Sequence, residues 1–276
     1  MNTSSDDRIA ALRRRFRALH ASGCFVIPNP WDPGSARYLA GLGFKALATT
    51  SSGFAWSRAQ PDNGVAREPV LAHLREMVAA TGLPINADFE SGFGADPAAV
   101  HDSVALAVAT GVAGLSIEDS TAEAARPLYD LPEAVERLRA ARRAIDAAGG
   151  DTLLVGRAEC YLVGRPDLRE TIARLQAYAE AGADCLYAPG LRSRDDIATL
   201  VRELAPKPVN LLVGSAFDLD VHAIAALGVR RISVGGALAR CAWGGFMRAA
   251  RALADGRFDG FAEAASGAEL NALMRG

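Results

Sequence analysis

The chain has 276 residues, half of them apolar, and a formal net charge of −2 at pH 7. The balanced charge and the lack of a basic stripe argue against nucleic-acid binding. No segment has the apolar length of a signal peptide or a membrane span. The four cysteines lie far apart without a Cys-x-x-Cys pair, which argues against a disulfide framework and fits a cytoplasmic protein.

Short apolar runs alternate with amphipathic segments along the whole chain. Between the runs, spacings such as Val70, Leu74 and Met77 are typical of helices. This alternation predicts parallel strands joined by right-handed crossovers. The predicted strands, in chain order, are residues 24–29, 46–50, 85–90, 114–118, 153–158, 185–188, 209–213 and 231–234. Eight such units in one domain, residues 1–276, indicate an α/β fold of the closed (β/α)8-barrel (TIM-barrel) type, which commonly takes about 250 residues. Residues 236–276 are predicted to form a C-terminal helical extension.

Acidic residues gather where predicted strands end, which is the end that carries chemistry in a (β/α)8 barrel. Asp88 and Glu90 lie two apart, so on a strand they would face the same side. Two such carboxylates repel each other unless a cation lies near them, and Mg²⁺ is held by few carboxylates and several waters. Glu118 ends the next strand. These three acids are the predicted metal ligands; the alternative is a set of solvated loop carboxylates.

Arg157 ends the fifth predicted strand. Its guanidinium could bind a substrate carboxylate in bidentate fashion. The alternative is a structural ion pair with Glu159 or Glu118.

Hydroxyl groups follow the second predicted strand, at Thr50, Ser51 and Ser52. With their backbone N–H groups they could bind a substrate carboxylate, or they could form an ordinary hydroxyl-rich turn. Asn210, early in strand seven, is a further predicted substrate-binding residue. Asp62 lies in Pro-Asp-Asn-Gly, which by itself is a turn signal.

These residues resemble the isocitrate lyase / phosphoenolpyruvate mutase superfamily over nearly the whole chain. The phrases that carry the resemblance are Pro-Asn-Pro-Trp-Asp at 28–32, Thr-Thr-Ser-Ser-Gly at 49–53, Ser-Gly-Phe-Gly at 91–94, Ile-Glu-Asp at 117–119 and Ser-Val-Gly-Gly at 233–236. The resemblance implies a barrel whose eighth helix is swapped between subunits, in a homodimer or homotetramer. It also implies Mg²⁺, with Mn²⁺ as a substitute.

The resemblance assigns roles by position. Asp88 matches the direct metal ligand, and Glu90 stands where the family has a second aspartate. Asp62 and Glu118 match outer acids of the metal site, with catalytic roles. The turn at 50–52 matches the carboxylate-binding turn, and Arg157 matches an arginine that contacts substrate.

The chain departs from the family in the loop at 119–129, which has neither the cysteine of the lyases nor the lysine of the mutases. Pro189 stands where mutase-like members have a histidine. Histidine is not expected to act as the base, because His20, His73, His101 and His222 lie in helical patterns. Tyr129 and Arg126 are the candidate proton donors in that loop.

The predicted function is cleavage of a carbon–carbon bond by a Mg²⁺-dependent lyase or decarboxylase. The substrate would be a small 2-oxo or 2-hydroxy (di)carboxylic acid, and the reaction would pass through an enolate stabilised by the metal. Two alternatives stay open. One is a phosphonopyruvate-type mutase or hydrolase, and the other is a binding protein for 2-oxo acids without catalysis.

Overall fold

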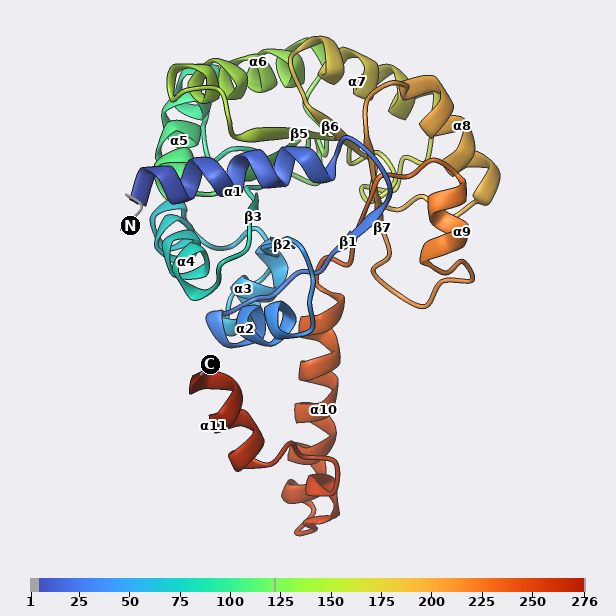
Figure 1. The fold of residues 1–276 in the computed structure, drawn as a ribbon. Coiled ribbons are helices and arrows are strands. Elements are labelled where there is room, and N and C mark those ends of the chain that lie inside the picture. The colour runs from blue at the N-terminus through green and yellow to red at the C-terminus, as the bar shows by residue number, and fades with distance from the viewer. Residues whose placement is uncertain (1–4, 122, 276) are drawn as a thin grey trace.

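The computed structural model describes residues 5–121 and 123–275. Its eight parallel strands form one sheet in the order β1-β8-β7-β6-β5-β4-β3-β2, surrounded by helices (Figure 1). The strands are β1 (Phe25–Ile27), β2 (Leu47–Ala48), β3 (Ile85–Asp88), β4 (Gly114–Glu118), β5 (Leu153–Arg157), β6 (Cys185–Tyr187), β7 (Val209–Leu212) and β8 (Arg231–Ser233). All eight predicted strands are present, each within two residues of the expected bounds. The (β/α)8 prediction is confirmed.

Helices connect successive strands and pack around the sheet. They are α1 (Ser5–Leu19), α2 (Pro33–Gly41), α3 (Ser51–Ser57), α4 (Arg67–Ala80), α5 (Pro97–Ala109), α6 (Leu131–Ala147), α7 (Leu168–Glu180), α8 (Arg194–Leu204), α9 (Val221–Ala226), α10 (Ala237–Ala254) and α11 (Gly267–Arg275), with a short 3₁₀ helix η1 (Asp259–Phe261). Several begin at an aspartate whose carboxylate accepts a backbone N–H, as Asp96 does from Ala99 at 2.9 Å. Within the described residues, no helix is long and apolar enough to cross a membrane.

The core has two parts. The larger part fills the space between the strands and the surrounding helices. The smaller part lies inside the barrel, where the fully buried Phe16 of α1 packs with Ala113 and Leu153. Helix α1 therefore closes one end of the barrel with apolar side chains, and the polar cavity described below opens at the other end.

The sheet closes between β1 and β2 without a ladder. The backbone N–H of Ala48 donates to the carbonyl of Pro28 at 3.1 Å. The amide of Asn29 then spans the gap, because it donates to the carbonyl of Thr49 at 2.8 Å and accepts from the N–H groups of Val234 and Gly235, each at 2.9 Å. One side chain thus links β1, β2 and the turn after β8.

Strand β3 ends at Asp88 and not at Glu90. Glu90 has φ +48°, in the left-handed region, within a turn where Gly92 N–H donates to the carbonyl of Phe89. Glu90 thus lies beyond the strand, where alternation no longer sets the direction of a side chain. Its place near Asp88 comes from the turn and not from the strand pairing that the sequence predicted.

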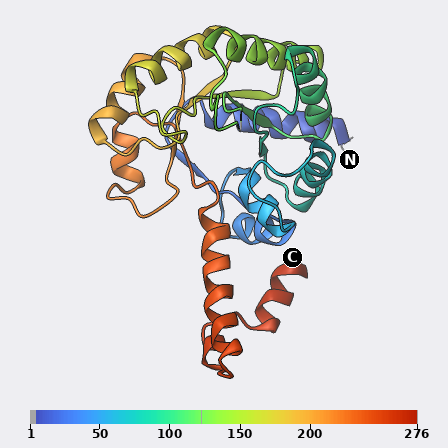
Figure 2. The same cartoon turned by 180° about the vertical axis from the view of Figure 1, so that it is seen from behind.

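The C-terminal segment forms an arm. Helix α10 runs away from the barrel, and α11 returns toward α2, where Arg37 Nη1 donates to the carbonyl of Met274 at 2.7 Å (Figures 1 and 2). The arm exposes large apolar side chains, including Trp243 (41%), Phe246 (61%) and Phe258 (70%). An apolar surface of this kind is typical of a protein–protein contact. The swap of this helix between subunits stays a prediction that the arm favours.

If a second copy covers the arm, Phe246→Asp will place a charge in that interface and shift the protein toward monomer. Light scattering of the wild type and the variant measures the mass directly. Leu106→Asp is the control. Leu106 is likewise a large apolar side chain that is exposed (40%), but it lies on α5 and not on the arm. A monomeric wild type would contradict the expectation.

Candidate active site

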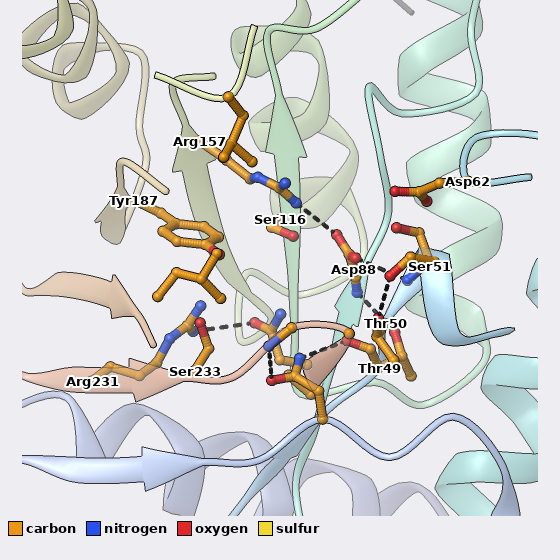
Figure 3. Close-up of a pocket in the computed structure, with 18 residues that line it drawn as sticks. Thr49, Thr50, Ser51, Asp62, Asp88, Ser116, Arg157, Tyr187, Arg231 and Ser233 are labelled. Carbon is orange, nitrogen blue, oxygen red and sulfur yellow. Dashed lines mark hydrogen bonds and ion pairs between the residues drawn. The ribbon is translucent and has the colours of Figure 1, made fainter. Parts of the chain in front are cut away.

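A cavity of about 160 Å³ opens at the C-terminal ends of the strands (Figure 3). This is smaller than the roughly 300–1,000 Å³ of pockets that hold drug-sized ligands, so it suits a small acid. Predicted site residues in its lining are Thr50, Ser51, Ser52, Asp62, Asp88 and Arg157. Glu90, Glu118 and Asn210 lie outside the lining. Lining residues that the sequence analysis did not single out as site residues include Asn29, Asn86, Ser116, Tyr187, Arg231 and Ser233.

Arg157 is the centre of an ion cluster. Its Nη1 atom lies 3.1 Å from Asp88 Oδ1 and 3.0 Å from Glu118 Oε2, and its Nε atom donates to Glu159. Burial alone would lower the pKa of Arg157, but the charges of Glu118 and Glu159 raise it well above its usual value. The two structural ion pairs considered in the sequence are therefore both present, and Arg157 also faces the cavity.

Asp119, which follows β4, holds the backbone next to this ion cluster. Its carboxylate accepts from the backbone N–H of Glu159 at 2.8 Å, from Arg174 Nη1 at 3.1 Å and from the hydroxyl of Tyr178 at 2.5 Å. Only 2% of Asp119 is exposed, so these hydrogen bonds are shielded from water. They hold the segment after β5 and so set the position of the Arg157–Glu159 pair.

Two further carboxylates face Asp88. Burial, followed by the charges of Asp88 and Asp62, raises the pKa of Glu90 to about 8. Burial and the charge of Asp88 also raise the pKa of Asp62. For Glu118, burial raises the pKa well above its usual range, and the contact with Arg157 opposes that shift. The acids thus outnumber the one guanidinium that they share.

The donor set fits a divalent cation. Carboxylate oxygens are the ligands that Mg²⁺ prefers, and Asp62 and Glu90 lie close enough to Asp88 for its charge to add to the effect of burial on their pKa values. In the described part of the chain, no three His, Cys, Asp or Glu side chains lie close enough to bind one ion directly. A site with one direct ligand, Asp88, and several waters agrees with both facts.

The hydroxyl turn is tied to Asp88. The backbone N–H of Ser51 donates to Asp88 Oδ2 at 2.9 Å, and the backbone N–H of Asp88 donates to Thr49 Oγ1 at 2.9 Å. Thr50 caps α3, where its hydroxyl accepts from the N–H of Gly53 at 3.3 Å. The turn therefore presents its hydroxyls beside the aspartate that would hold the metal.

Asn210 does not face the cavity. Its side chain accepts from Arg231 Nε at 2.7 Å and donates to Ser233 Oγ at 2.9 Å, and it is 1% exposed. It positions two lining residues instead of contacting a ligand itself. Arg231 and Ser233 lie two apart on β8, so strand alternation in the sequence could have found them as a polar pair on one face.

The two proton-donor candidates of the 119–129 loop lie outside the cavity lining. Arg126 pairs with Glu133 on the exposed side of the loop, and Tyr129 packs under the guanidinium of Arg137, 4.2 Å from its ring centre. The cavity lining instead holds the phenol of Tyr187. It lies in the cavity between Arg157 and Arg231 (Figure 3) and hydrogen-bonds with Ser233.

This fold and this site define an enzyme class: a (β/α)8 barrel with acids, hydroxyls and an arginine at its mouth. The sequence profile of phosphoenolpyruvate phosphomutase matches residues 16–254, so the chain belongs to the phosphoenolpyruvate mutase / isocitrate lyase superfamily. It is similar to the crystal structure of a candidate lyase or mutase of Burkholderia cenocepacia J2315, with 48% identity over 98% of both chains and a TM-score of 0.93.

Two relatives bear names that specify a substrate. Oxaloacetate decarboxylase of Chromohalobacter salexigens is 31% identical, over 79% of this chain and 77% of that protein. A solved structure of oxaloacetate acetylhydrolase with its product oxalate is 27% identical over 96% of this chain and 94% of that one, with a TM-score of 0.84. The family and these relatives are lyases and mutases of small acids.

Glu90 gives a pH-dependent test of the carboxylate group. Because its folded pKa, about 8, exceeds its usual 4.5, ionisation of Glu90 destabilises the metal-free protein increasingly from about pH 4.5 to pH 8. Glu90→Gln will therefore leave the Tm unchanged at pH 5 and raise it by roughly 2–4 °C at pH 8.5. Thermal unfolding in EDTA measures the difference, and Glu76→Gln on α4 is the control. An equal effect at both pH values would contradict the burial of this charge.

Proposed function

We propose that the protein is a Mg²⁺-dependent lyase or decarboxylase that cleaves a carbon–carbon bond beside the carbonyl or hydroxyl of a small 2-oxo or 2-hydroxy acid. The observation that carries the proposal is the cavity in which Asp88 is surrounded by Asp62, Arg157 and the hydroxyl turn. The carboxylates of the cavity suit a divalent cation, and its hydroxyl, N–H and guanidinium donors suit a substrate carboxylate. The relatives named for oxaloacetate support the substrate class.

Asp88 would hold the metal, with Asp62, Glu90 and Glu118 binding its waters. A bound divalent ion would polarise the substrate carbonyl and stabilise the negative charge of an enolate. Ser51 and Ser52 would bind the carboxylate next to that carbonyl, and Arg157 would orient it. In a 2-oxo acid, the electron pair of the broken bond stays on the carbon beside the carbonyl, and that carbon must then take a proton. In a 2-hydroxy acid, the hydroxyl becomes a carbonyl and its proton would pass to one of the neighbouring carboxylates, while the carbon that keeps the electron pair takes a proton.

Tyr187 is the cavity group placed to give that proton. Burial, opposed by the charge of Arg157, raises its pKa to about 12, so the phenol is protonated at neutral pH. The guanidinium of Arg157 lies 5.1 Å from the ring centre and would stabilise the phenolate left after transfer. Solvent would then return the proton to Tyr187.

Phosphonate chemistry is less well supported. The chain has only two lysines, Lys45 and Lys207, and neither lines the cavity. Lys207 donates to the carbonyl of Ala183 at 2.7 Å, before the N-terminal ends of β6 and β7 and so at the end of the barrel opposite the cavity. Transfer of a phosphoryl group would thus rely on Arg157 and the metal alone.

Purified protein with Mg²⁺ should turn over oxaloacetate or a malate-type acid, and Asp88→Ala should lower that rate at least about 100-fold, since metal-site changes of this kind abolish metal-dependent rate. Release of CO₂ or pyruvate is the readout. Asp88→Asn separates loss of charge from loss of packing, and Asp102→Ala, an 80% exposed side chain, is the control.

If neither oxaloacetate nor any malate-type acid is turned over, but a 2-oxo acid binds tightly with Mg²⁺, the binding-protein alternative is established. Release of phosphate or phosphoenolpyruvate from phosphonopyruvate would establish the phosphonate alternative. Unchanged Mg²⁺-dependent binding in Asp88→Ala would remove Asp88 from the metal site.

Tyr187→Phe keeps the ring and removes the proton. If the phenol protonates the enolate, kcat should fall by about 10²–10⁴, the usual contribution of a general acid, while KM changes little. Tyr38→Phe, a half-exposed tyrosine of α2, is the control. An unchanged kcat would assign the proton to solvent.

A further inference from the structure

The floor of the cavity holds a second arginine, Arg231. Only 2% of Arg231 is exposed, yet it lines the same cavity as Asp88 and Arg157. Its recorded hydrogen bonds go from Nε to Asn210 Oδ1 at 2.7 Å and from Nη1 to Asn86 Oδ1 at 3.4 Å. Among residues 5–121 and 123–275, it forms no ion pair within 4 Å.

The neighbouring titratable groups do not offset this charge. Burial, together with the charge of Arg231, lowers the pKa of His20 to about 3, so the imidazole is neutral at pH 7. Burial raises the pKa of the Cys185 thiol, which is neutral as well. The carboxylate of Asp184 acts on both of these groups but forms its ion pairs with Arg17 and Arg142. A buried guanidinium that has no ion pair among the described residues is costly, and an apolar side chain would fill the floor at less cost.

The two arginines of the cavity therefore differ. Arg157 shares its charge with three carboxylates, whereas Arg231 is held by two amide oxygens that orient the guanidinium without neutralising it. Nη2 takes no part in those hydrogen bonds, so it is available to the cavity. Ser233, two residues along β8, lies near Arg231 in the lining, whereas Ser116 lies nearer to Arg157 and Asp88 (Figure 3). The hydroxyl protons of Ser116 and Ser233 are already engaged, with the carbonyl of Ala87 and with Tyr187. The guanidinium of Arg231 is therefore the group that offers charge and an N–H donor to a carboxylate.

We propose that Arg231 binds the second carboxylate of a dicarboxylic acid. The inference rests on the proposed function for the first carboxylate, which would lie at the Ser51–Ser52 turn, and it narrows the substrate to a dicarboxylate. The acid spans the cavity from its acidic mouth to its cationic floor, and the guanidinium of Arg231 sets which end enters first.

The test compares succinate with butyrate, two probes of equal chain length that differ by one carboxylate. With Mg²⁺ and in chloride-free buffer, calorimetry of the wild type should show tighter binding of succinate. Arg231→Met should weaken the binding of succinate by about 10- to 100-fold, the loss expected for a charged hydrogen bond. The affinity for butyrate should stay unchanged. Arg230→Met is the matched control, because the adjacent Arg230 donates to the carbonyl of Gly23 outside the cavity.

Equal binding of succinate and butyrate by the wild type, or an equal loss of both in Arg231→Met, would overturn the proposal. If Arg231→Met does not fold, the wild type still decides: succinate must raise its Tm more than butyrate does at the same concentration. This readout needs no turnover. A protein that prefers succinate but cleaves no acid would therefore refute the proposed function and keep the dicarboxylate site.

Discussion

The ion cluster of Arg157 is the interaction on which the rest of the site depends. Three neighbouring strands bring their ends together there, since Asp88 ends β3, Glu118 ends β4 and Arg157 ends β5. The β4–β5 register places Glu118 opposite Arg157, so the ladder and the ion pair require the same alignment. Without the guanidinium, the acids at these ends would repel one another in a half-buried space.

Charge changes sign along the axis of the barrel. The mouth carries a surplus of carboxylates around Asp88, and the floor carries the unpaired guanidinium of Arg231. Such a cavity distinguishes the two ends of an asymmetric ligand before any atom reacts, because a cation is attracted to one end and an anion to the other. Tyr187 lies between the two ends, where a proton would be delivered (Figure 3).

Much of the fold was predictable because each strand is a short apolar run and its end is polar. The hydroxyls of Thr50–Ser52, the carboxylate of Asp88 and the guanidinium of Arg157 were predicted from that pattern together with the family resemblance. Side-chain direction was harder. Glu90 lies past a turn that the sequence did not reveal, and Asn210 turns toward Arg231 instead of the cavity. Tyr187 lies within an apolar run, where periodicity alone does not say which face points inward. Arg231 alternates with Ser233 on β8, a signal that the sequence did carry.

Strands β1 and β2 are neighbours in the barrel that are not joined by a β ladder. Elsewhere the strands are joined by ladders, but here the amide of Asn29 spans the gap as a clasp. The backbone hydrogen bond of Ala48 to Pro28 crosses this junction, and the turn that carries Ser51 and Ser52 directly follows β2 there. Because Asn29 also lines the cavity, a change at Asn29 would alter both the wall of the site and the hydrogen bond that holds the carbonyl of Thr49, where the hydroxyl turn begins.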